Sequence, residues 1–155
     1  MNLSLSKYMK LQDFGAFLFI AAAGSIGHFI YEWTHSPLAA LFFPVNESPW
    51  EHLKLLFFPF LIWMLWNSRN DNFHCCLFFY SCLLSVLAGM LSILILYYTY
   101  TGIIGSHFLL ADILIFFVGI WVSLSLIPVT ARRLSTVPSC TLVYAAWIGL
   151  TLLFF

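Results

Sequence analysis

The sequence is organised around residues 44–54, Pro44-Val45-Asn46-Glu47-Ser48-Pro49-Trp50-Glu51-His52-Leu53-Lys54. This stretch places two carboxylates, an imidazole and an ammonium group at the start of a helix that is otherwise strongly apolar. Ser48 and Glu51 have the S-x-x-E spacing of a capping box, and Pro49 takes the first helical position, which proline favours. Charged groups at membrane depth are costly and usually face a protein interior or a wet cavity. The stretch is therefore the first candidate for a functional site.

The composition predicts an integral membrane protein. Of its 155 residues, 63% are hydrophobic and only 8% are charged, and the mean hydropathy is +0.99. Soluble domains carry about 25% charged residues. The length allows about five spans of roughly 20 residues and no separate soluble domain, so residues 1–155 are predicted to form a single transmembrane domain. The net charge of zero and the lack of a Lys/Arg-rich run exclude a nucleic-acid partner and leave the lipid bilayer as the expected one.

The hydrophobic pattern predicts an all-α bundle of five transmembrane helices, at about residues 13–33, 49–66, 73–98, 106–128 and 140–155. Between the first two lies an apolar piece, residues 38–43, with Pro37 before it and Pro44 after it. This piece is too short to span a bilayer. We therefore expect it to be interfacial or re-entrant.

The basic residues predict the orientation of the chain. They fall on alternate connections of the five-helix arrangement, and the remaining connections carry neither lysine nor arginine: Lys7, Lys10, Arg69, Arg132 and Arg133. Cytoplasmic loops are enriched in Lys and Arg. We therefore expect a multi-pass protein of the cell (plasma) membrane, with a cytoplasmic N-terminus and an extracytoplasmic C-terminus.

On this topology, ionisable side chains from three helices converge at the outer leaflet. Histidine combined with Asp or Glu is the ligand set of zinc and other divalent ions, and also the set for proton transfer. A divalent metal, zinc before others, is the predicted cofactor. The predicted metal ligands are His28, Glu32, Glu51, His52 and Asp112, and the predicted catalytic residues are Glu51, Glu47 and Asp112.

Some of these residues also have a purely structural interpretation. Glu51 can serve only to close the capping box. Glu47 precedes the helix and can be a solvated loop residue. His28 and Glu32 are four residues apart, share a helix face, and can be a paired interfacial couple.

Asp112 has no such alternative, because no basic residue lies near it in the sequence. It sits about two turns inside the predicted fourth helix. A lone carboxylate buried there takes up a proton or finds a partner. We therefore expect Asp112 to lie within hydrogen-bond or shared-ion distance of His28, Glu32 or the pair Glu51 and His52.

Three functions are compatible with this pattern. The first is a metal-binding protein that hydrolyses a lipid-linked or small extracytoplasmic substrate. The second is a proton- or ion-coupled transporter or channel, in which the same groups act as relays and a homo-oligomer can form. The third is a non-catalytic partner subunit in which the cluster locks helices together. The predicted cytoplasmic halves of the helices carry almost no ionisable group, which favours a one-sided site over conduction.

Two segments carry a resemblance to a known family, residues 28–33 and 44–54, with the patterns HxxYEW and PVNESxWEHLK. Residues 98–102, followed by Asp112, add to it. On these segments the chain resembles a family of small bacterial polytopic membrane proteins of unknown function. The resemblance implies a bacterial inner membrane and brings no activity with it.

Overall fold

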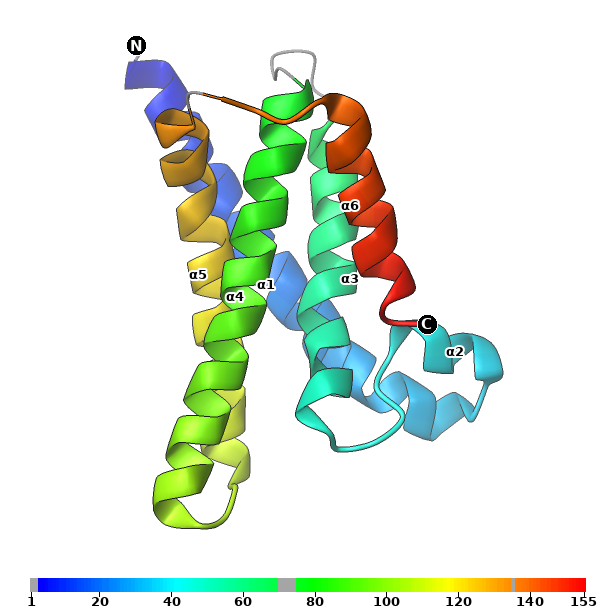
Figure 1. The fold of residues 1–155 in the computed structure, drawn as a ribbon. Coiled ribbons are helices and arrows are strands. Elements are labelled where there is room, and N and C mark those ends of the chain that lie inside the picture. Colours follow the sequence, from blue (N-terminus) through cyan, green and yellow to red (C-terminus); the bar gives the residue numbers. More distant parts are fainter. Residues whose placement is uncertain (1–2, 70–74, 135) are drawn as a thin grey trace.

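The chain folds into helices that run back and forth along a common direction (Figure 1). The structure, a computed structural model, describes residues 3–69, 75–134 and 136–155, and the side chains of residues 14–69, 76–134 and 136–155. In these residues there are six helices and no strand, which confirms the all-α prediction. The helices are α1 (Leu3–Thr34), α2 (Pro37–Phe42), α3 (Pro49–Asn67), α4 (Cys75–Ile104), α5 (Leu109–Arg133) and α6 (Cys140–Leu152).

The helix ends gather at two poles of the molecule. The first described turns of α1, the end of α3 and the α5–α6 connection lie at one pole (Figure 1). The end of α1, the start of α3 and the α4–α5 turn lie at the other, which we call the site pole. The C-terminus lies beside α2 on the same side of the molecule.

Helix α3 forms the centre of the core. Its eight consecutive residues 53–60 are all buried, so this helix is enclosed on every side rather than along one stripe. Phe57 and Phe60 are fully buried there, and Trp147 of α6 packs against Phe57 with ring centroids 6.0 Å apart. The first turn of α3 therefore directly precedes the longest run of buried residues in the described part of the chain.

Close helix contacts depend on glycine at two places. A Cβ atom added to Gly24 of α1 would lie 2.7 Å from the backbone oxygen of Leu55 in α3. A Cβ atom added to Gly89 of α4 would lie 2.6 Å from the backbone oxygen of Gly119 in α5. Both distances are too short for a side chain, so these crossings require the absence of one.

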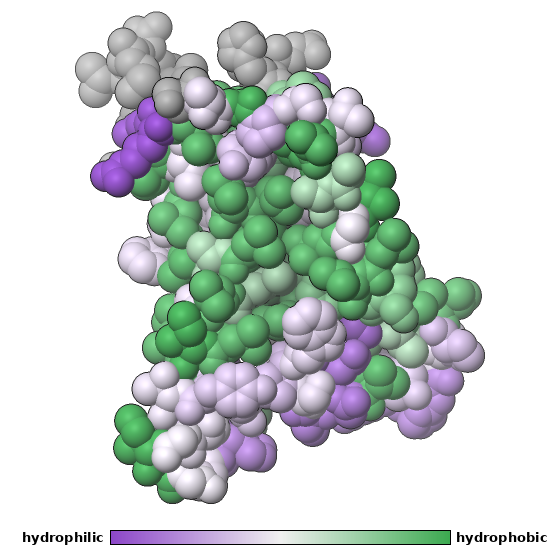
Figure 2. Space-filling model, viewed as in Figure 1, coloured by the Kyte–Doolittle hydropathy of each residue, from purple (hydrophilic) through white to green (hydrophobic). Residues whose placement is uncertain are grey.

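Three described helical segments are long and apolar enough to cross a membrane, Phe14–Thr34, Cys76–Ile104 and Leu109–Arg133. Hydrophobic residues dominate the middle of the face drawn in Figure 2, and the more hydrophilic residues lie toward the two poles. These features are compatible with a membrane protein. The count of five spans and the re-entrant segment, which folds as the short helix α2, stay predictions.

Several helix ends differ from the predicted ones. Helix α1 begins at Leu3 instead of residue 13, and α6 ends at Leu152. Helix α4 continues from the predicted end at 98 to Ile104, because Gly102 remains helical and the chain turns only at Gly105, whose φ is +80°. Helix α5 starts at Leu109 and continues past Pro128 to Arg133, where basic side chains favour a helix C-terminus.

Candidate metal centre

Three side chains from two helices and one loop meet at the site pole. They are His28 of α1, Glu47 of the loop before α3, and His52 in the first turn of α3. One ligand atom of each lies within 4.8 Å of the other two. The two histidines are half-buried and Glu47 is exposed, so this group, the metal group, could hold a metal ion while remaining open on one side.

The geometry of His52 orients one of its ring nitrogens toward Glu47. Its Nδ1 lies 2.9 Å from the backbone oxygen of Ser48. A carbonyl oxygen only accepts, so Nδ1 carries the hydrogen and donates it. The other nitrogen, Nε2, lies 3.4 Å from Oε2 of Glu47. In neutral imidazole this nitrogen presents a lone pair to a carboxylate, an arrangement that suits a metal cation between the two.

His28 completes the group from α1. Its ring centroid lies 5.1 Å from that of His52, with an angle of 51° between the ring planes. Its Nδ1 is buried and has no hydrogen-bond partner among the residues that the structure describes. A buried polar nitrogen without a partner costs about 1–3 kcal/mol. The close crossing at Gly24, one turn earlier in α1, is what lets His28 reach the start of α3.

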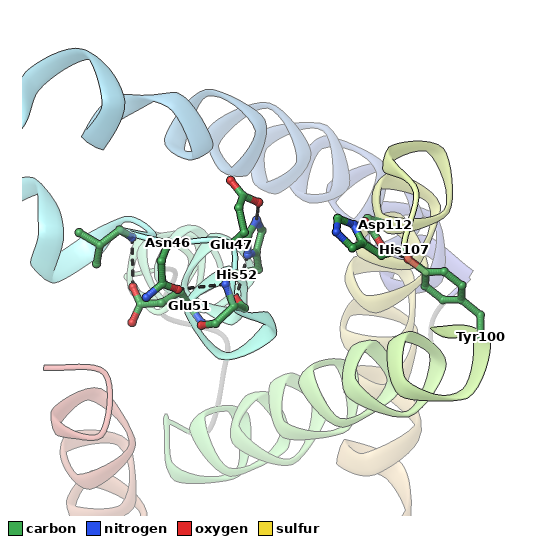
Figure 3. Close-up of polar contacts among 9 residues, drawn as sticks. Asn46, Glu47, Glu51, His52, Tyr100, His107 and Asp112 are labelled. Carbon is green, nitrogen blue, oxygen red and sulfur yellow. Dashed lines mark hydrogen bonds and ion pairs between the residues drawn. The ribbon is translucent and has the colours of Figure 1, made fainter. Parts of the chain in front are cut away.

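Two hydrogen bonds between residues close in sequence hold the loop that carries Glu47. The side-chain oxygen of Asn46 accepts a hydrogen bond from the backbone N–H of Ser48 at 2.9 Å. The Ser48 hydroxyl in turn accepts one from the backbone N–H of Glu51 at 3.3 Å, and so caps α3. Glu47 lies between these two contacts, next to His52 in Figure 3.

Glu51 has a different environment from the metal group. Its Oε2 accepts hydrogen bonds from Nζ of Lys54 at 2.9 Å and from the backbone N–H of Val45 at 3.3 Å. Lys54 is buried and also donates to the backbone oxygen of Ala40 in α2, at 3.1 Å. The predicted capping box is therefore half formed: the serine caps the helix, and the glutamate is turned to Lys54. Glu51 thus ties α2 and its loop to α3.

Glu32 also lies outside the metal group. It is exposed and sits one helical turn beyond His28, close to the end of α1. Helix α1 ends at Thr34, and the next residue, His35, has a φ of +46° and donates its backbone N–H to the oxygen of Tyr31. In the described part of the chain, His28 and Glu32 do not form an ion pair with each other.

Asp112 belongs to a second polar cluster, formed by the α4–α5 hairpin. Its Oδ1 accepts a hydrogen bond from the hydroxyl of Tyr100, and its Oδ2 lies 3.4 Å from Nδ1 of His107. The Tyr100 hydroxyl also accepts from the backbone N–H of Phe108 at 3.4 Å. Asp112 therefore has partners from its own hairpin, instead of the hydrogen bond or shared ion that we expected with His28, Glu32 or the pair Glu51 and His52.

The two clusters face one cavity of about 360 Å³ between α1, α3, α4 and α5. His28, Glu47 and His52 line one wall, and His107 and Asp112 line the other. Figure 3 shows Glu47 and His52 on one side of the space between the helices and His107 and Asp112 on the other, with His107 on the side of Asp112 that faces Glu47 and His52. The polar groups thus meet around a cavity and form two sites in it.

The family whose model matches the chain is described as a family of unknown function, DUF6512, and the match covers residues 3–155. The chain belongs to DUF6512. Neither a curated protein nor a solved structure matches it. The resemblance to a family of unknown function is thereby confirmed, while the bacterial origin and the signature patterns stay predictions.

In this DUF6512 member, sequence reasoning found the histidines of the metal group and took Glu47 for a catalytic residue. It missed the partnership of Tyr100 and His107 with Asp112. One signal for it was available, since Tyr100, His107 and Asp112 flank a single short turn. The roles of Glu32, Glu51 and Asp112 as ligands or catalytic groups stay predictions.

Proposed function

We propose that this protein is a multi-pass membrane protein that binds a divalent metal ion through His28, Glu47 and His52. One observation carries the proposal: the hydrogen bond of His52 to Ser48 leaves its second ring nitrogen facing the Glu47 carboxylate, beside the ring of His28. Metal-binding histidines commonly donate their other ring N–H to a backbone carbonyl in this way. The bond fixes both the tautomer and the direction of the ring.

Zinc fits this donor set best. Two imidazoles and one carboxylate are the protein ligands of several catalytic zinc sites, in which a fourth position stays open for water or substrate. The exposure of Glu47 and the adjoining cavity support such an open position. An ion held there would supply Lewis-acid chemistry for the hydrolysis of a lipid-linked or small extracytoplasmic substrate.

The proposal places the metal group at the outer face of the membrane. The described arginines Arg69, Arg132 and Arg133 follow or end α3 and α5 at the pole opposite to the site. The positive-inside rule then assigns that pole to the cytoplasm. Helices α1, α3, α4, α5 and α6 would cross the bilayer in this arrangement, although α6, with 13 residues, is only about 20 Å long.

Conduction is the competing function, and the distribution of polar groups argues against it. Both clusters lie at the site pole and face one cavity. A path through the membrane would need polar groups along its whole length. An enzyme or receptor site open to one side is therefore the better fit.

Elemental analysis of the detergent-purified protein tests the metal site. We expect about one zinc ion per chain in the wild type, and its loss in His28→Gln and in His52→Gln. His35→Asn is the matched control, because this exposed histidine lies outside the group and asparagine tolerates its positive φ. Wild-type protein without bound metal, even after incubation with zinc, would refute the proposal, and pH-dependent ion flux in liposomes would then favour a transporter.

A further inference from the structure

The geometry points to an amphiphile as the ligand of the cavity: an oxygen-donor head at the metal group and an apolar body between the helices. This inference rests on the proposed metal site and adds the class of molecule that the site would take. The volume of about 360 Å³ lies in the range of ligand pockets and far exceeds the space of a single water molecule.

Most of the cavity wall is apolar. Leu55 of α3, Ile93 of α4, and Ile113 and Phe116 of α5 contribute side chains that offer no hydrogen bond. Apart from Ser25 and Tyr97, the polar side chains that line the cavity belong to the two clusters on opposite walls. A small polar solute would leave this apolar surface wetted or empty, whereas a hydrocarbon body would cover it and exclude water from it.

The head of the ligand follows from the charges at the metal group. A divalent ion with two neutral imidazoles and one carboxylate keeps one net positive charge. No lysine or arginine lines the cavity in the part of the chain that the structure describes. A head with a single negative charge on oxygen, such as a carboxylate or a phosphate diester, balances the metal group. On the other wall the Asp112 carboxylate has its own partners, Tyr100 and His107.

Part of the cavity lining consists of exposed apolar side chains. Phe29 of α1 and Leu109 and Ile113 of α5 line it, and 44%, 70% and 41% of these residues respectively are exposed. All three lie in helical segments apolar enough to cross a membrane, and Leu109 is the first residue of one of these segments. We expect the ligand to enter past these side chains from the hydrocarbon core of the membrane, with its chain lying along α1 and α5.

Cobalt-loaded protein in nanodiscs tests this inference, because cobalt reports its ligands in the visible spectrum. The probes are two hydroxamic acids with the same metal-binding head, acetohydroxamic acid and dodecanohydroxamic acid. Ile113→Trp fills the cavity from the wall opposite to the metal group. Leu114→Trp is the matched control, because its neighbouring position on α5 is also exposed and does not line the cavity.

We expect both probes to change the cobalt spectrum of the wild type. Ile113→Trp should weaken the response to the long probe at least tenfold and leave the short probe within about twofold, while Leu114→Trp changes neither. The control removes the effect of the membrane, which concentrates the long probe around every variant. Ser25→Phe narrows the cavity from α1 and should act like Ile113→Trp, which keeps the test decisive if one variant fails to fold.

The outcomes separate the two proposals. If the wild type binds no cobalt, the metal site fails and the inference falls with it. If cobalt binds and the long probe changes the cobalt spectrum equally in Ile113→Trp, Ser25→Phe and Leu114→Trp, the metal site stands and the amphiphile-binding cavity is refuted.

Discussion

At the scale of single residues, Lys54 shows how a charged group in an apolar core is satisfied. It is 3% exposed, and its ammonium group contacts the Glu51 carboxylate and the backbone oxygen of Ala40. A buried ion pair of this kind adds little net stability, since the cost of removing both charges from water offsets their attraction. Removing only one partner destabilises the fold, because the other charge is then left without its partner in a largely apolar environment.

Lys54→Met should therefore destabilise the protein by about 3–5 kcal/mol, through the unpaired Glu51 carboxylate. The double variant Lys54→Met with Glu51→Gln should recover most of this loss, because it removes both charges. Unfolding in detergent measures the stability, and zinc content should stay at one ion per folded chain in both variants. A single variant as stable as the double one would show that the pair is not coupled, and a loss of zinc in the folded double variant would return Glu51 to the ligands.

At the scale of elements, the crossing of α1 over α3 brings His28 to His52. The crossing is close because Gly24 has no side chain: an added Cβ would lie 2.7 Å from the Leu55 oxygen and 2.6 Å from Cζ of Phe116. The Leu55 oxygen belongs to the backbone of the central helix and cannot move away easily. The metal group therefore depends on a residue that is not itself a ligand.

Gly24→Ala should push α1 away from α3, with a loss of stability of about 1–3 kcal/mol from overpacking and a zinc affinity at least tenfold weaker. Gly15→Ala is the control on the same helix, because nothing lies within 4 Å of the added atom. There alanine should be neutral or stabilising by up to about 1 kcal/mol, its advantage in helix propensity. Equal zinc affinities in the two variants would contradict the link between the crossing and the site.

At the scale of the whole molecule, the two poles differ in charge and in chemistry. The site pole carries the cavity with its histidines and carboxylates, and the opposite pole carries the described arginines. A bilayer around the hydrophobic middle would hold these poles on different sides. The orientation then decides which compartment supplies metal and ligand.

Cysteine labelling in intact cells, in a variant without the native cysteines, tests this orientation. Ser106 lies in the exposed α4–α5 turn and Thr136 in the exposed α5–α6 connection. We expect a membrane-impermeant maleimide to label Ser106→Cys in intact cells, and to label Thr136→Cys only after the cells are permeabilised. The opposite pattern would place the site in the cytoplasm and contradict the extracytoplasmic location.

The helical class, the apolar segments that form α1, α4 and α5, and the start of α3 could be predicted from the sequence, whereas the predicted count of five spans stays a prediction. These features follow from local properties, namely runs of apolar residues and the spacing of Ser48 and Pro49 in the chain. The same local reasoning located most of the ionisable groups at one pole. It could not assign partners, because a carboxylate at a helix start has several candidates within reach.

Only the tertiary structure decided which groups meet. The crossing at Gly24 joined His28 to His52, and the loop that carries Glu47 brought in a third donor from outside the helices. Glu51 was drawn to Lys54, since a buried ammonium group needs a charged partner more than a capping box needs its second hydrogen bond. Asp112 took its partners, Tyr100 and His107, from the hairpin that carries it. The metal group depends on the distance between α1 and α3, which the packing at Gly24 sets. Glu51 and Asp112 instead took partners within α3 and within the α4–α5 hairpin, because those groups lie nearest to them in the folded chain.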